Sequence, residues 1–201
     1  MEMKERILDG AMDLYSRYGQ NRVSMEEIAA YLNISKKTIY NHFKNKTALF
    51  QEAVNYYFRR LVDDMQAHIN DTEKGFADRL HGFLTHSYME LGKKDSRFFE
   101  DLRVFNEGLE DSPLLFVRKR IAGIITAFID SAKEEGIIEK DINTLNVTYV
   151  FLTIMNGIIL WDVRDHLPVS RVEILKSTIK ITLEGLLTEK GRDILKETLD
   201  D

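Results

Sequence analysis

The sequence predicts an all-α protein in which an N-terminal three-helix head is joined to a larger helical body. Apolar residues recur three or four positions apart through nearly the whole chain of 201 residues. We identify no segment with the alternation of a β-strand, no internal repeat and no low-complexity tract. The chain is also long enough to bury a full core, as one large or two small domains.

The first predicted helix covers residues 3–18. Ile7, Ala11, Leu14 and Tyr18 form an apolar stripe along it, and the pattern ends at Gly19. We expect this helix to pack beneath the two short helices that follow.

Those two short helices are predicted from their end signals. Ser24 followed by Glu27 is a capping box, because each side chain can bond to the backbone amide of the other residue. Asn33 should end this helix, since asparagine tolerates the left-handed conformation of a C-terminal cap. Ser35 then opens a second helix after a very short turn.

The second short helix is predicted to have one apolar and one polar side. Ile39 and Phe43 form the apolar side, together with Ile34 in the turn. The polar side carries Lys36, Lys37, Thr38, Tyr40, Asn41 and His42. This layout is that of a helix-turn-helix, whose second helix enters the DNA major groove.

The charge distribution supports a local DNA-binding surface. Residues 1–60 carry a net charge of +3 and residues 61–201 a net charge of −8, although the whole chain is at −5. Between Glu27 and Glu52 there is no acidic residue, whereas there are four lysines. A small basic surface on an acidic body fits phosphate binding by the head alone.

The helix-turn-helix resembles the DNA-binding signature of the TetR family of bacterial transcriptional regulators. The resemblance rests on Ser24, Ile28–Ala29, Ile34–Ser35, Ile39–Tyr40, His42–Phe43, Lys46 and Leu49. Asn33 stands where the family most often has glycine, and asparagine preserves the left-handed turn. The motif covers the N-terminal quarter only. The resemblance implies a DNA-binding domain at 1–46 and a helical ligand-sensing and dimerisation domain at 47–201.

Resemblance and chemistry point to the same DNA-binding residues. These are Ser24, Ser35, Lys36, Lys37, Thr38, Tyr40, Asn41, His42 and Lys46. Lys36 and Lys37 can reach base edges or phosphates, whereas Tyr40, His42 and Lys46 are better suited to phosphates. For each residue the alternative is a solvated polar side chain.

The remaining chain is predicted to form six or seven further helices. A long helix from Lys46 to about Ile69 should belong to both domains and transmit movement between them. The others are expected around Phe76–Tyr88, 97–108, 113–135, 143–163, 170–187 and 189–199.

Residues 142–161 contain no charged residue, a length that would span a membrane. Six of the twenty are asparagine or threonine, so we predict instead a helix buried on nearly every side. By resemblance, helices 143–163 and 170–187 would form a four-helix bundle in a homodimer. The alternative is that they close the core of a single chain.

A ligand pocket is expected among the middle helices, where aromatic and methionine residues concentrate. The candidate ligand-binding residues are Phe83, Tyr88, Phe99, Arg103, Phe105, Phe128, Met155 and Asn156. Aromatic residues at helical spacing are ordinarily core, which is the alternative for each. The composition favours a small, mainly apolar ligand.

The sequence offers no basis for an enzyme or for a bound cofactor or metal. It has no cysteine, and we find no His-Glu-x-x-His motif, phosphate-binding glycine loop or Gly-x-Ser-x-Gly turn. The N-terminus is amphipathic and has no apolar signal region, so a cytoplasmic location without membrane attachment is expected.

The favoured function is a homodimeric repressor that a small-molecule effector releases from a palindromic operator in double-stranded DNA. Repression is favoured over activation because occupancy alone blocks a promoter. The alternative is a DNA-binding module without sequence preference, or a protein-interaction module. An enzyme is the least favoured hypothesis.

Overall fold

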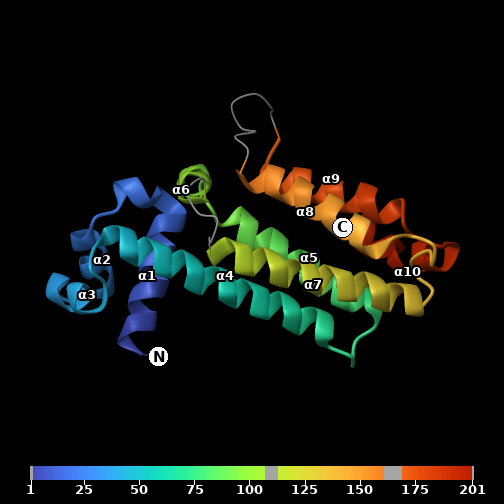
Figure 1. Ribbon diagram of the computed structural model, residues 1–201, viewed down its shortest axis with the longest axis horizontal. Coiled ribbons are helices and arrows are strands. Elements are labelled where there is room, and N and C mark those ends of the chain that lie inside the picture. Colours follow the sequence, from blue (N-terminus) through green and yellow to red (C-terminus); the bar gives the residue numbers. More distant parts are fainter. Residues whose placement is uncertain (1, 107–112, 161–168, 201) are drawn as a thin grey trace. The chain divides into compact units, whose positions relative to one another are not determined.

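The computed structural model describes residues 2–106, 113–160 and 169–200 and is helical throughout (Figure 1). The elements are α1 (Met3–Tyr18), the 3-10 turn η1 (Gln20–Arg22), α2 (Met25–Leu32), α3 (Lys36–His42), α4 (Lys46–Asn70), α5 (Phe76–Gly92), α6 (Ser96–Asn106), α7 (Pro113–Glu134), α8 (Thr144–Leu160), α9 (Arg171–Glu184) and α10 (Glu189–Asp200). Within the described residues, β-type pairing is limited to one bridge between Ile138 and Leu187. The predicted all-α fold is confirmed.

The chain divides into two compact units. The head unit consists of Met1–Leu61 and Lys93–Val117, and the body unit of Val62–Gly92 and Arg118–Asp201. Both α4 and α7 continue from one unit into the other. The boundary after residue 46, which concerns the DNA-binding domain alone, stays a prediction.

The head unit has a core built from α1, α2, α3 and the first part of α4. Tyr15 and Phe50 meet there edge to face, with their ring centroids 5.3 Å apart, and both are fully buried. Arg6 of α1 donates to the carbonyl of Leu32 at 2.6 Å and so satisfies a free acceptor at the end of α2. These contacts hold α2 against α1.

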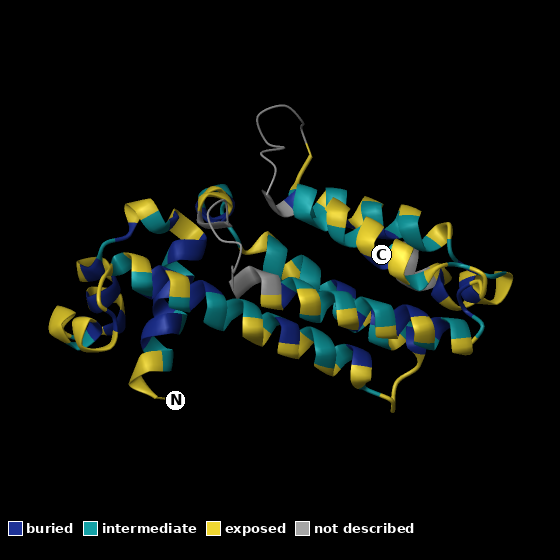
Figure 2. Ribbon diagram, viewed as in Figure 1, coloured by how far each residue is buried: buried dark blue, intermediate teal, exposed yellow. Residues whose placement is uncertain are grey.

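The predicted ends of α2 and α3 are confirmed. Ser24 and Glu27 form the capping box, and Asn33 adopts the left-handed conformation, with φ 52° and ψ 49°. Ser35 caps α3 by accepting from the amide of Thr38. Figure 2 shows α3 mainly as exposed, although Ile39 is fully buried.

The body unit is assembled around α5 and α9. Helix α9 packs against both α5 and α8, and α10 packs against α5. Phe76 of α5 stacks on Phe128 of α7, with ring centroids 4.4 Å apart and an interplanar angle of 11°. Apolar residues from these helices line a cavity, which is analysed below.

The predicted end of α9 was wrong. The helix ends at Glu184 and not at Leu187. Leu187 pairs with Ile138 instead, and the hydroxyl of Thr188 donates to the carbonyl of Gly136 at 2.8 Å. This long-range pairing overrides the helical spacing of the apolar residues.

Helix α8 is not buried on nearly every side within one chain. Tyr149 and Val150 are 66% and 55% exposed, and Leu145 is exposed as well. Helix α9 covers only part of the apolar surface of α8. In the described part of the chain, no helix is long and apolar enough to cross a membrane.

The left-handed turn at Asn33 leads to a stability test. In Asn33→Ala the backbone of residue 33 must keep its positive φ, which alanine tolerates less well than asparagine. The free energy of unfolding should therefore fall by about 1 kcal/mol. Asn33→Gly is the matched control and should unfold at the same urea concentration as the wild type, or higher. Equal unfolding midpoints for the alanine and glycine variants would show that the left-handed conformation at residue 33 does not disfavour alanine.

Candidate nucleic-acid interface and ligand cavity

The head unit presents the predicted DNA-binding residues on and around α3. Ser35, Lys36, Lys37, Tyr40, Asn41 and His42 are exposed, and Ser24, Thr38 and Lys46 are half-buried. Ile39 and Phe43 are buried, with exposed fractions of 0% and 1%. Helix α3 therefore turns its apolar side into the head and leaves its basic and polar side accessible.

Local hydrogen bonds fix the start of both helices that carry these residues. The hydroxyl of Ser35 accepts from the Thr38 amide at 3.0 Å and lies 2.8 Å from the Thr38 hydroxyl. Asn45 caps α4 by accepting from the Ala48 amide at 2.8 Å. Lys46 is thus the first residue of α4, beside backbone amides that favour an anion.

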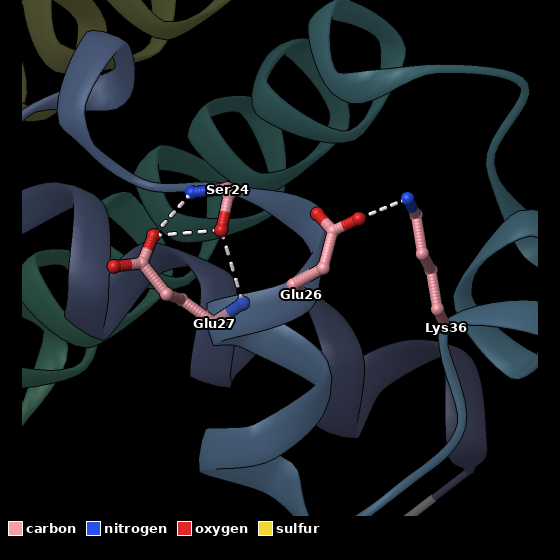
Figure 3. A network of polar contacts seen from close by, with 4 residues as sticks. All are labelled: Ser24, Glu26, Glu27 and Lys36. Carbon is pink, nitrogen blue, oxygen red and sulfur yellow. Dashed lines mark hydrogen bonds and ion pairs between the residues drawn. The ribbon is translucent and has the colours of Figure 1, made fainter.

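Ser24 is engaged by its own capping box (Figure 3). Its hydroxyl donates to the Glu27 carboxylate at 2.7 Å and accepts from the Glu27 amide at 3.1 Å. Hydrogen bonding from the Ser24 amide lowers the pKa of Glu27, so this carboxylate stays charged beside Ser24. A phosphate contact by the Ser24 hydroxyl would have to compete with that carboxylate.

Lys36 is paired with an acidic residue that was not among the predicted site residues. Its ammonium forms an ion pair with Glu26 of α2 (Figure 3). The same ammonium lies 5.7 Å from the ring centroid of Tyr40. The hydrogen bond between Lys36 and Glu26 lowers the pKa of Glu26 and raises the pKa of Lys36. The ion pair with Glu26 partly compensates the charge that Lys36 can offer to a phosphate.

The body unit contains an apolar cavity of about 70 Å³. It is lined by Ile69, Phe76, Leu80, Phe83, Leu84, Ile125, Phe128, Ile129, Ile138, Val147, Phe151, Ile179, Thr182, Leu183 and Leu186. Thr182 is the one lining residue with a polar side chain. Such a wall suits an uncharged apolar molecule, since a buried charge would have no partner there.

The positive charge of Arg79, which lies near the cavity, is paired within the protein. The Arg79 guanidinium lies 5.7 Å from the ring centroids of both Phe76 and Phe128, which line the cavity. Equal distances to two stacked rings place it beside the stack and not over one ring face. It donates to the carboxylate of Glu135 at 2.7 Å, so its charge is paired within the protein.

The predicted ligand-binding residues are distributed over both units. Phe83 and Phe128 line the cavity. Tyr88, Met155 and Asn156 belong to the body unit but not to the cavity wall, and the ring of Tyr88 lies under Lys176. Phe99 and Arg103 belong to the head unit, and the side chain of Phe105 lies outside the described residues. Their roles in ligand binding stay predictions.

Most of the cavity wall was missed because aliphatic residues carry no distinguishing signal. Ile69, Leu80 and Leu84 occupy the same helical positions as ordinary core residues. Only the packing of several helices leaves a space among them. The sequence prediction favoured aromatic residues and therefore found two of the wall residues.

An exposed basic helix on a capped two-helix motif is the arrangement of a helix-turn-helix domain. Residues 7–53 match the pattern of "Bacterial regulatory proteins, tetR family". This match confirms the predicted resemblance to the TetR family over the N-terminal part of the chain.

Two curated relatives are regulators of a biofilm operon. The icaADBC negative transcriptional regulator IcaR of Staphylococcus aureus is 27% identical over 100 residues, which cover 50% of this chain and 53% of that protein. IcaR of Staphylococcus epidermidis is 25% identical over 107 residues, or 53% of this chain and 57% of that protein. The chain thus spans about half the length of the curated relatives it matches. These proteins and the family are regulators and not enzymes, in agreement with the sequence prediction.

Solved structures share the fold at low sequence identity. A TetR-family regulator from Marinobacter aquaeolei VT8 has a TM-score of 0.73 and 17% identity, with 100% of this chain and 98% of that chain covered. SmeT, the repressor of the Stenotrophomonas maltophilia multidrug efflux pump SmeDEF, has a TM-score of 0.68 and 16% identity, with coverages of 94% and 92%. The likeness therefore extends over the whole fold and not only over the head.

The Glu26–Lys36 pair leads to a test by Glu26→Gln. This change should tighten binding to duplex DNA severalfold, because it frees Lys36 and removes a negative charge beside α3. The free energy of unfolding should change by less than about 0.5 kcal/mol, since exposed pairs contribute little. Fluorescence anisotropy with a labelled duplex measures the affinity.

The matched control is Glu52→Gln, which breaks the exposed Lys4–Glu52 pair of α1 and α4. It removes the same charge from a position outside α2 and α3. An equal gain in affinity from both variants would show a general charge effect and no particular role for Lys36.

Proposed function

We propose that the protein is a sequence-specific DNA-binding transcriptional regulator that acts as a homodimeric repressor. The observation that carries the proposal is α3, whose exposed side combines Lys36, Lys37 and Tyr40 within a matched family motif. Such a helix can enter the major groove and read base edges, while residues at its flanks bind phosphates. Repression is supported by the relatives IcaR and SmeT, which are named a negative regulator and a repressor.

The dimer is supported by the uncovered apolar surface of α8 and α9. Tyr149 and Ile181 are 66% and 72% exposed in the single chain, and Leu145, Val150 and Ile154 extend the surface along α8. Exposed apolar patches of this kind mark interaction surfaces. A two-fold dimer would bring two heads to a palindromic operator.

The effector is proposed to be a small, uncharged and mainly apolar molecule that occupies the cavity of the body unit. The cavity wall contains no charged side chain, and Arg79 nearby is paired with Glu135. An effector of this kind releases DNA only if it binds the released conformation more tightly than the DNA-bound one. Helix α4 begins at Lys46 and contributes Ile69 to the cavity. The same helix therefore carries a predicted phosphate-binding residue and a residue of the cavity wall.

The first test is selection of bound duplexes from a random DNA pool by the purified full chain. We expect an enriched palindrome whose affinity falls roughly a thousandfold between 50 and 200 mM salt if about six phosphates are contacted. The double variant Tyr40→Ala, Lys46→Ala should lose the enrichment while keeping its helical circular dichroism. Equal binding to selected and random duplexes would favour the module without sequence preference.

The second test probes the cavity with xenon, an uncharged apolar atom. A dry apolar cavity of about 150 Å³ in another protein binds benzene or xenon. Since the present cavity is about 70 Å³, xenon should bind without rearrangement, whereas benzene should require the wall to open. Val147→Phe places a ring into the space and should abolish the xenon-induced changes in methyl chemical shifts. Changes that persist in this variant would place the binding site elsewhere.

A further inference from the structure

A buried carboxylate of α6 is bonded to the turn that follows α1. Asp101 is 9% exposed, and its carboxylate accepts from the backbone amide of Gln20 and, at 3.1 Å, from the side-chain amide of Asn21. These residues lie about eighty positions apart in the sequence, within the same head unit. Burial raises the pKa of Asp101, while the bond from the Gln20 amide opposes that shift.

The same corner is held by a second, backbone contact. The amide of Asp95, just before α6, donates to the carbonyl of Ser16 in α1 at 2.7 Å. Gly19 has a positive φ of 78°, and a Cβ added there would lie 2.9 Å from the Cβ of Arg97 and 3.0 Å from the Asp101 carboxylate. The close approach of α6 therefore depends on glycine at position 19.

Asp101 supplies a cap that the local sequence lacks. The turn η1 has Gly19 before it and no side-chain cap of its own, so the Gln20 amide would otherwise have no acceptor from its own segment. The turn leads through Val23 to Ser24, where α2 begins. A change in this turn alters the direction in which the helix-turn-helix leaves α1.

We infer that Asp101 is a positioning residue for DNA binding, because its carboxylate fastens α6 to the α1–α2 connection and sets the orientation of the helix-turn-helix. This inference rests on the proposed function.

The test compares Asp101→Ala, Asp101→Asn and Glu100→Ala in the full chain. Two quantities are measured: hydrogen exchange of the Gln20 amide, and affinity for the duplex selected by the wild type. Affinity is measured at a temperature where circular dichroism shows every variant folded, so a loss of global stability alone would leave it unchanged.

Asp101→Ala should accelerate exchange of the Gln20 amide and weaken duplex binding, each by about tenfold or more, as expected for loss of a hydrogen bond to a charged group. Asp101→Asn should stay near the wild type, because the Asn21 amide can turn over and bond to an asparagine partner. Glu100→Ala removes an equal charge from an exposed position of α6 and should leave exchange unchanged.

The direction of the affinity change separates positioning from electrostatics. Loss of a negative charge from the head should by itself tighten DNA binding, whereas loss of the positioning contact should weaken it. Unchanged Gln20 exchange and unchanged or tighter binding in Asp101→Ala would overturn the inference. If Asp101→Ala fails to fold, Gln20→Pro removes the same donor from the other partner, and the ψ of 155° at Gly19 suits a following proline.

The exchange measurement also separates this inference from the proposed function. If the wild type selects no duplex, the proposed regulator is wrong. Protection of the Gln20 amide that is lost in Asp101→Ala would still establish the contact between α6 and the turn. Equal exchange in wild type and variant would refute that contact whatever the DNA result.

Discussion

The presentation of α3 depends on the burial of one side of a seven-residue helix. A helix this short is not stable alone, so its geometry comes from packing and from its ends. Ile39 and Phe43 are fully buried, while Ser35 caps the first turn. Lys37 is exposed because helical spacing places it nearly opposite Ile39, and Lys36 and Tyr40 are exposed at the flanks of the buried side.

Two of the predicted DNA-binding side chains of the head are bonded to acidic residues of α2. Lys36 is paired with Glu26, and the hydroxyl of Ser24 is bonded to Glu27. Glu26 compensates part of the charge that Lys36 can offer to a phosphate, and Glu27 competes for the hydroxyl of Ser24.

The interior of the body unit contains a cavity among aliphatic and phenyl groups. Unfilled apolar space forfeits dispersion contacts and so costs stability. The wall carries no charged side chain, because a charge in this apolar interior would lack a partner.

The sequence by itself determined the helices, their caps and the exposed face of α3. Those features depend on interactions between residues three or four positions apart, such as Ser24 with Glu27, or on the conformational preference of one residue, such as Asn33. Only the tertiary structure decided that α9 ends at Glu184, that Asp101 caps a distant turn, and that a cavity lies behind Ile69 and Leu84. Each of these features results from contacts between elements that are far apart in the chain. The residues next to a buried carboxylate or leucine in the sequence do not predict which distant residue it contacts.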